Sequence, residues 1–195
     1  MSRRTRDPSS RRALEALGVS DQAARPLVPG LPTWQGDDLV VVIETPRGSR
    51  TKLAYVPMWG TFMAKRILPA GMVFPYDFGF VPGTLADDGD PLDVLVLSDG
   101  AVPMGAVVLT RLVGVIEAEQ REGSGTWVRN DRLLGVAACS DAQRSVTDLR
   151  DLDRGLLAEI EAFFVDYHRV HGREFRPIHR RGATVARGLV RSATA

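Results

Sequence analysis

Short apolar runs separated by turn-forming residues dominate the chain from about residue 37 to residue 138. Several runs alternate apolar and polar side chains, which is the period of a strand with one buried face, and Gly or Pro lies in the gaps. Gly123-Ser124-Gly125 is typical of a hairpin turn. We expect strands at residues 39–43, 51–58, 61–68, 78–81, 92–97, 107–119, 126–128 and 132–138. Many short strands at regular spacing indicate a closed or nearly closed β-barrel.

Further along the chain the apolar period lengthens to that of a helix. Apolar and aromatic residues recur three and four positions apart at Leu156, Leu157, Ile160, Phe163, Phe164 and Tyr167. Asp153 is a suitable N-cap for this helix, and Gly172 is a suitable end. A weaker helical pattern covers residues 183–191. The pattern therefore predicts a mainly β protein with barrel strands first and helices last.

The first 36 residues differ from the rest of the chain. Ser9 or Ser10 is placed to cap a short helix over residues 11–17, and prolines 26, 29 and 32 then indicate an irregular linker. We expect an N-terminal extension at residues 1–36 and one domain at residues 37–195. A chain of 195 residues is long enough for one well-buried core and short for two.

Composition narrows the class of protein without identifying it. Apolar residues make up 44% and charged residues 25% of the chain, and the net charge of +1 gives no reason to expect nucleic acid or an acidic membrane surface as a partner. No apolar run approaches the roughly 18 residues of a membrane-spanning helix. Cys139 is the only cysteine, so no intrachain disulfide can form, and its place after an apolar run predicts a buried thiol. These features favour a cytoplasmic protein.

The strongest chemical signal is an acidic turn. Asp87-Asp88-Gly89-Asp90-Pro91-Leu92-Asp93 holds four carboxylates and leads directly into the apolar run Val94-Leu95-Val96-Leu97. Carboxylates held this close raise one another's pKa unless a cation lies among them. Hard divalent cations such as Mg²⁺ prefer oxygen ligands of this kind. The turn favours a metal site at the entrance of a buried strand, and a solvated acidic turn is the plainer alternative.

Three other kinds of metal-binding protein also carry acidic segments of this kind. An EF-hand loop counted from Asp88 requires Gly at its sixth position and Glu at its twelfth, where this chain has Asp93 and Asp99. A phosphatase that forms an aspartyl phosphate carries its Asp pair at the end of an apolar strand, whereas here the strand comes after the pair. A sugar-nucleotide transferase with a lone Asp-x-Asp pair stays open, although it leaves Asp93 unexplained.

Other polar residues form a recognisable order of motifs along the chain. Singly, each is typical of a solvated side chain. Together with the acidic turn they follow one sequence of motifs: Glu44, Lys52, Arg66, Phe74-Pro75-Tyr76-Asp77-Phe78-Gly79-Phe80, Asp88-Gly89-Asp90-Pro91-Leu92-Asp93 and, later, Phe163-Phe164 with Tyr167. In this order and spacing the chain resembles the soluble inorganic pyrophosphatases, the Mg²⁺-dependent, barrel-forming family, from about Asp37 to about Phe175.

The resemblance implies a fold, an activity and a partner. The fold would be a five-stranded barrel of the oligonucleotide-binding (OB-like) type with flanking C-terminal helices. The activity would be hydrolysis of pyrophosphate to two phosphates by an inorganic diphosphatase. The cofactor would be Mg²⁺, with other hard divalent cations such as Mn²⁺ as substitutes, and the chain would assemble as a homo-oligomer without nucleic acid or membrane partners.

The resemblance also assigns residue roles. It implies that Asp88, Asp93 and the hairpin residue Asp131 bind metal. It makes Asp90 the group that orients or deprotonates the attacking water. Lys52, Arg66 and Tyr167 would grip phosphate oxygens, and Glu44 would hold metal-bound water at the rim of the site.

The chain also departs from the family pattern. Ala54 stands where the family has Glu, Phe74 and Phe78 where it has Tyr, Gln120 beside Glu119 where it has a metal-binding Asp, and His168 where it has Lys. Strict alignment places Asn130, not Asp131, at the hairpin Asp. These changes keep two alternatives open: hydrolysis of another phosphoanhydride, such as a nucleotide or polyphosphate, and phosphate binding without turnover.

Overall fold

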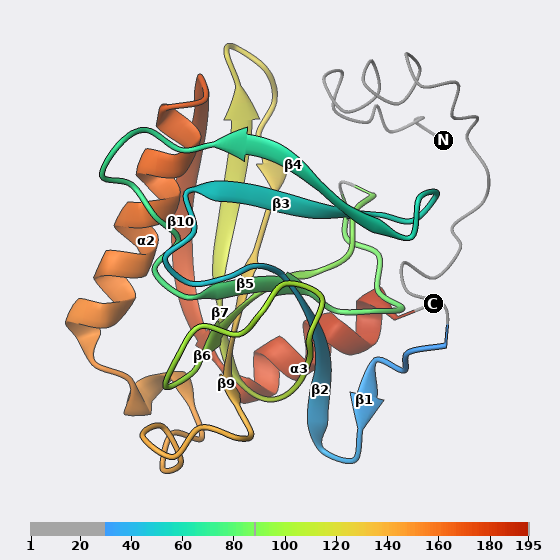
Figure 1. Cartoon of the computed structure of the whole chain (residues 1–195). Helices are drawn as coiled ribbons and strands as arrows, with labels where there is room; N and C mark the ends of the chain where they lie inside the picture. Colours follow the sequence, from blue (N-terminus) through green and yellow to red (C-terminus); the bar gives the residue numbers. More distant parts are fainter. Residues whose placement is uncertain (1–29, 88, 195) are drawn as a thin grey trace.

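The computed structural model describes residues 30–87 and 89–194 (Figure 1). The short helix predicted at residues 11–17 and the acidic residue Asp88 lie outside the described residues. Within the described part of the chain, neither helix is both long and apolar enough to cross a membrane.

Five strands close into a ring. They are β2 (Asp38–Thr45), β5 (Asp77–Phe80), β6 (Asp93–Leu97), β9 (Arg132–Ala137) and β7 (Val107–Glu122). Each pairs with the next in this order, and β7 also pairs with β2, which closes the barrel. All of these pairs are antiparallel except β6 with β9. The predicted five-stranded barrel is confirmed.

The remaining elements surround this ring. The hairpin of β3 (Thr51–Val56) and β4 (Thr61–Ile67) is a separate two-stranded sheet, which lies above β5 in the view of Figure 1. The shorter or outer strands are β1 (Trp34–Gln35), β8 (Val128–Arg129) and β10 (Arg173–Gly182). The helical elements are η1 (Leu149–Asp151), α2 (Arg154–Arg169) and α3 (Ala183–Ala193).

All five barrel strands precede the helices, as predicted, but one strand was missed and one residue was wrongly placed. The missed strand is β10, which lies between α2 and α3. Its ten residues are mostly charged and exposed, with Phe175 alone buried, because it is an outer strand whose side chains pair with acids on β7. Cys139 is exposed, because β9 ends at Ala137 and the chain turns away from the core.

Helix α2 forms where its apolar period predicts it. Asp153 caps it, since its carboxylate accepts hydrogen bonds from the backbone N–H groups of Gly155 (2.7 Å) and Leu156 (3.2 Å). The buried face carries Leu157, Ile160, Phe164 and His168. This spacing places them on one side of the helix, against the barrel.

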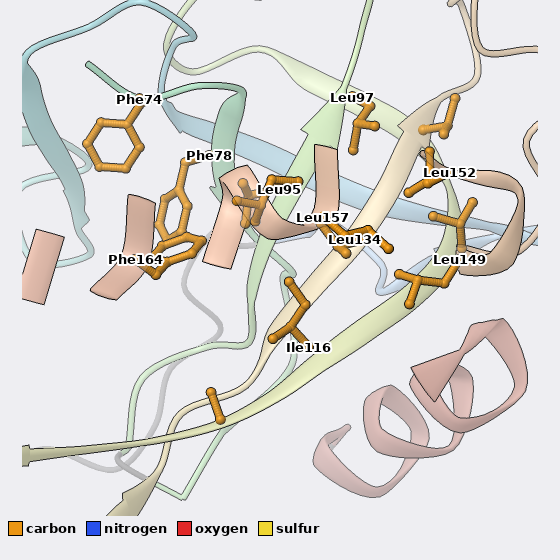
Figure 2. Close-up of a cluster of buried hydrophobic side chains, with 14 of the residues drawn as sticks. Phe74, Phe78, Leu95, Leu97, Ile116, Leu134, Leu149, Leu152, Leu157 and Phe164 are labelled. Carbon is orange, nitrogen blue, oxygen red and sulfur yellow. The ribbon is translucent and has the colours of Figure 1, made fainter. Parts of the chain in front are cut away.

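The core gathers on two sides of the barrel sheet. One cluster packs α2 and η1 against the barrel, with Phe74, Phe78 and Phe164 at one end and Leu149 and Leu152 at the other (Figure 2). The second cluster includes Ala186 and Val190 of α3. Gly79 allows β5 to approach β2, because a Cβ there would lie 2.3 Å from the Val42 carbonyl oxygen. This packing fixes where β6 and β9 begin, and the acidic turn lies at that point.

Candidate active site

The acidic loop, residues 86–93, is closed by its own backbone. The Ala86 N–H donates to the Asp90 carbonyl oxygen at 2.7 Å, and the Gly89 N–H donates to the Ala86 carbonyl oxygen at 3.0 Å. Gly89 has φ +88°, a conformation that side chains other than hydrogen make costly. The neighbouring Leu85 N–H donates to the Ala193 carbonyl oxygen of α3 at 2.8 Å. The carboxylates are therefore carried on an anchored loop.

Residues 85–87 and 91–93 form one wall of a cleft of about 470 Å³. Residues 129–133 form a second wall, and the end of α3 contributes Leu189, Ser192 and Ala193. Asp87, Asp93 and Asp131 all line this cleft. The structure thus brings together two of the three predicted metal ligands, Asp93 and Asp131, which are far apart in the sequence.

Asp93 is paired with Arg132. The parallel strands β6 and β9 begin at these two residues, directly before the register pair Val94 and Leu133. Nη1 of Arg132 lies 2.8 Å from Oδ2 of Asp93. The same nitrogen donates to the side-chain oxygen of Asn130 and to the Asp131 carbonyl oxygen at 2.9 Å. The guanidinium therefore joins the acidic loop to the hairpin segment at residues 129–133, the second wall of the cleft.

Asp131 is held by two other donors. Its Oδ1 accepts hydrogen bonds from the Ala118 N–H at 2.9 Å and from Nε of Arg129 at 2.6 Å. Arg129 also lies 3.1 Å from Glu117, so its guanidinium is shared between two carboxylates. Strands β7 and β9 position Asp131 at the cleft with only 12% of its side chain exposed.

Two of the predicted phosphate-binding residues lie on the β3–β4 hairpin. Lys52 and Arg66 are direct cross-strand partners, so their side chains share one face, as the sequence predicts. Nζ of Lys52 lies 2.9 Å from Oε2 of Glu44 and 4.0 Å from the centroid of the Phe78 ring. The other oxygen of Glu44 accepts the Tyr55 N–H at 2.7 Å. Glu44 is only 8% exposed, so it is a buried partner of Lys52 in this arrangement.

Tyr167 joins the two halves of the site. Burial raises the pKa of its hydroxyl, Arg66 and Arg132 act to lower that pKa, and Asp93 acts to raise it. These charges influence Tyr167 because they lie around it. A raised pKa keeps the phenol protonated at neutral pH, so Tyr167 is available as a hydrogen-bond donor.

Two of the departures from the family pattern touch each other. Nε2 of His168 lies 3.1 Å from the side-chain amide of Gln120, and Nδ1 lies 2.7 Å from the Phe164 carbonyl oxygen. Burial, reinforced by Arg132, lowers the pKa of His168 to about 3, so the ring is neutral. A neutral ring that donates from Nδ1 accepts at Nε2, so the Gln120 amide, whose oxygen and nitrogen exchange places by rotation, must present its NH₂ group and not Oε1 at this contact. His168 and Gln120 thus form an uncharged pair beside Arg132.

The neutral state of His168 predicts a pH-dependent stability. Because the folded-state pKa lies below the unfolded value of 6.5, its contribution is intact above about pH 6.5 and is lost as the pH falls. The expected loss between about pH 7 and pH 5 is about 2 kcal/mol in the free energy of unfolding. Urea unfolding of wild type and His168→Gln at both pH values measures it, and an equal loss in the two proteins would refute the assignment.

The cleft suits a hard cation by its donor chemistry. The acidic side chains that line it offer carboxylate oxygens, and neither His nor Cys is among its lining residues. Over residues 30–87 and 89–194, no three His, Cys, Asp or Glu side chains lie close enough to hold a metal by themselves. Asp88, the third predicted ligand, is outside that range, so the full ligand set stays a prediction.

Sequence reasoning missed the importance of Arg132 and Asn130. Both lie in the segment that contains Asp131, and the sequence indicated a metal-binding role for the Asp131 carboxylate alone. The contact of Arg132 with Asp93 depends on the parallel pairing of β6 with β9, a long-range feature that local patterns do not report. A basic residue at the start of a second buried strand was the one available signal.

Comparison with known proteins agrees with this geometry. A family model described as inorganic pyrophosphatase matches residues 41–195. The inorganic pyrophosphatase of Thermus thermophilus is 40% identical over 127 residues, which cover 65% of this chain and 70% of the relative. Soluble inorganic pyrophosphatase 2 of Chlamydomonas reinhardtii is 37% identical over 153 residues, 78% of this chain and 77% of the relative.

Solved structures give the same result. The crystal structure of the Thermus thermophilus inorganic pyrophosphatase superposes with a TM-score of 0.78 at 34% identity, covering 86% of this chain and 96% of that one. The Neisseria gonorrhoeae inorganic pyrophosphatase superposes with the same TM-score at 27% identity and the same coverage. The barrel, the order of the motifs and these matches lead to one conclusion: the chain belongs to the inorganic pyrophosphatase family.

Proposed function

We propose that this protein hydrolyses inorganic pyrophosphate to two phosphates. The observation that carries the proposal is the convergence of separate elements on one cleft. Asp87, Asp93, Asp131 and Arg132 line it, and Asp93, Arg132 and Arg66 of the β3–β4 hairpin all lie within electrostatic reach of Tyr167. Acidic residues for a cation beside basic residues for an anion suit a small metal–polyanion substrate.

A divalent cation is expected for a member of this family, and we propose Mg²⁺ held by Asp88, Asp93 and Asp131. When bound, such a cation lowers the pKa of a coordinated water and neutralises phosphate charge. The ligands are hard oxygens, which is the preference of Mg²⁺ and Mn²⁺.

Asp90 is the proposed proton acceptor. It lies in the acidic loop between the two predicted ligands Asp88 and Asp93, and its backbone carbonyl oxygen closes the turn by accepting the Ala86 N–H. Its side chain is exposed and is not among the residues that line the cleft, so the role of orienting the attacking water and taking its proton rests on its place in the motif.

Lys52, Arg66 and Tyr167 are the proposed phosphate-binding groups. Charge spreads over the phosphoryl oxygens in the transition state, and fixed cations and hydrogen-bond donors stabilise it there. Lys52 contacts Glu44 in the described arrangement, so engaging a phosphate requires Lys52 to divide its three donors between Glu44 and the substrate. Nε of Arg132 is a buried donor without an acceptor among the described residues, and a phosphate oxygen would satisfy it.

The assay that tests this proposal is phosphate release from pyrophosphate by purified protein, with Mg²⁺ and with excess chelator. We expect release that depends on Mg²⁺, and we expect a nucleoside triphosphate and a short polyphosphate to be turned over far more slowly. Faster turnover of the nucleotide than of pyrophosphate would replace the proposed substrate. We expect the protein to act in the cytoplasm as a homo-oligomer, which fractionation and light scattering would check.

A second candidate function is phosphate binding without turnover. The observation that favours it is that both described candidate ligands are already paired with arginine, Asp93 with Arg132 and Asp131 with Arg129. Binding of pyrophosphate without any release of phosphate at saturating Mg²⁺ would support this alternative over hydrolysis.

The choice of Asp131 as third ligand gives a further prediction. Asp131→Asn is expected to lower kcat/KM for pyrophosphate far more than Glu119→Gln, because Asp131 lines the cleft while Glu119 bonds Arg176 of β10 at 2.6 Å. Loss of one ligand costs more than the roughly 10–100-fold seen for groups that only support ligands. Steady-state kinetics of both variants decide the order, and a larger loss for Glu119→Gln would move the third ligand to β7.

A further inference from the structure

Arg132 is a buried cation among the residues that line the candidate metal-binding cleft. It is only 5% exposed, and its guanidinium carbon lies 5.0 Å from the ring centroid of Phe164 and 5.6 Å from that of Phe175. Aromatic faces hold a guanidinium through their quadrupole and by stacking. The cation is therefore fixed at this position by its surroundings and not only by its ion pair.

The polar contacts of Arg132 are oxygens of the kind a metal seeks. Nη1 bonds Oδ2 of Asp93 at 2.8 Å, the side-chain oxygen of Asn130, and the Asp131 carbonyl oxygen at 2.9 Å. These three oxygens come from the acidic loop and the hairpin, the two walls of the cleft. One nitrogen of a fixed cation thus contacts a carboxylate oxygen of the proposed ligand Asp93 and two further oxygens of the opposite wall.

We infer that Arg132 is a resident counter-cation that competes with the metal ion for Asp93. The inference rests on the proposed function, in which Asp93 binds metal. Two cations bound to one carboxylate oxygen exclude each other by position and by repulsion. Loading of the cleft therefore requires Nη1 to leave Asp93, while the aromatic contacts keep the rest of the guanidinium in place. The protein would need a higher metal concentration than the same site without Arg132.

Binding of Mn²⁺ to wild type and to Arg132→Met, followed by titration calorimetry and by electron paramagnetic resonance, tests this inference. Met keeps an unbranched apolar side chain against the two aromatic rings and removes the charge. We expect Mn²⁺ to bind about tenfold or more tightly to the variant, because the repulsion between the guanidinium and the ion is removed. The double variant Asp93→Asn with Arg132→Met is expected to lose that gain.

A matched control separates a local effect from a change in net charge. Arg150→Met removes the same charge at a side chain that is 88% exposed and paired with Asp148. We expect its Mn²⁺ affinity to equal that of wild type. A gain in Arg150→Met as large as that in Arg132→Met would overturn the inference, and so would an unchanged or weaker affinity in folded Arg132→Met.

Arg132→Lys keeps the inference testable if the Met variant does not fold, as thermal unfolding would report. Lys lacks the planar fork, so we expect its hold on Asp93 to weaken and Mn²⁺ affinity to rise by about threefold or more. An affinity equal to wild type in folded Arg132→Lys would contradict the competition. Phosphate release by wild type is measured separately. If wild type hydrolyses pyrophosphate but neither Arg132 variant gains Mn²⁺ affinity, this inference alone is overturned. If wild type neither hydrolyses pyrophosphate nor binds Mn²⁺, the proposed function is overturned as well.

Discussion

Asp93→Asn is expected to reduce pyrophosphate hydrolysis to background and to weaken Mn²⁺ binding by more than about 100-fold, the upper range for residues that merely support a ligand. Asp93 begins β6 at the cleft, and the amide of Asn cannot supply the negative charge that a hard cation prefers. Phosphate release and calorimetry on the same preparation measure both effects.

Asparagine is a better replacement than alanine for structural reasons. Arg132 has 6% of its side chain exposed, so Asp93→Ala would leave a buried cation without its partner at a cost of about 3 kcal/mol, the lower end for such pairs because Asp93 is itself 31% exposed. The Asn oxygen still accepts from Arg132. Loss of activity in Asp93→Asn with an unchanged unfolding midpoint therefore reports on the site and not on folding.

Asp99→Asn is the matched control for this change. Asp99 follows the opposite end of β6, where its carboxylate accepts from Ser140 and the Asp141 N–H. We expect this variant to retain activity and Mn²⁺ affinity. Near-normal turnover by Asp93→Asn, or an equal loss in Asp99→Asn, would show that the assigned ligand is wrong.

Asp90→Asn is expected to lower kcat by about 10²–10⁴-fold, the range for loss of a general base. Since Asp90 is assigned to the water and not to the metal, Mn²⁺ affinity should change by less than about threefold, far below the effect of losing a ligand. A parallel loss of Mn²⁺ binding and activity would instead make Asp90 a metal ligand. Pre-steady-state phosphate release distinguishes a slower chemical step from slower product release.

The barrel was predictable because its strands carry their own pattern. Strands β2, β6 and β9 are buried apolar runs bounded by turns, and Asp153 with the apolar face of α2 marks the helix. Strand β10 was not predictable from the same rules. Its outward side chains are arginines that pair with Glu117 and Glu119 of β7, so charge replaces the alternation expected of a half-buried strand.

The site was predictable in its members but not in its contacts. Motif order assembled Lys52, Arg66, Asp93 and Tyr167, and the structure brings Arg66, Asp93 and Tyr167 near one another. The links made by Arg132 and by the His168–Gln120 pair require knowledge of which strands are neighbours. Pairing between distant segments is set by the closed sheet, and a local sequence pattern contains no record of it.

Three of the departures from the family pattern, Gln120, His168 and Asn130, make hydrogen bonds at the candidate site. Gln120 and His168, which look like two independent losses of charge in the sequence, form one hydrogen-bonded neutral pair. Asn130 accepts from Arg132, so an amide and a guanidinium occupy the hairpin wall of the cleft. These changes predict a site with fewer fixed anions than the family pattern, in which the guanidinium of Arg132 is the fixed cation.

A crystal grown with Mn²⁺ tests the central claim most directly, namely that the acidic loop and the hairpin hold a hard cation between them. The account predicts an anomalous peak within coordination distance of Asp88, Asp93 and Asp131, with Nη1 of Arg132 withdrawn from Asp93. An empty cleft at saturating Mn²⁺, with Arg132 still bound to Asp93 and the loop carboxylates turned to solvent, would contradict it.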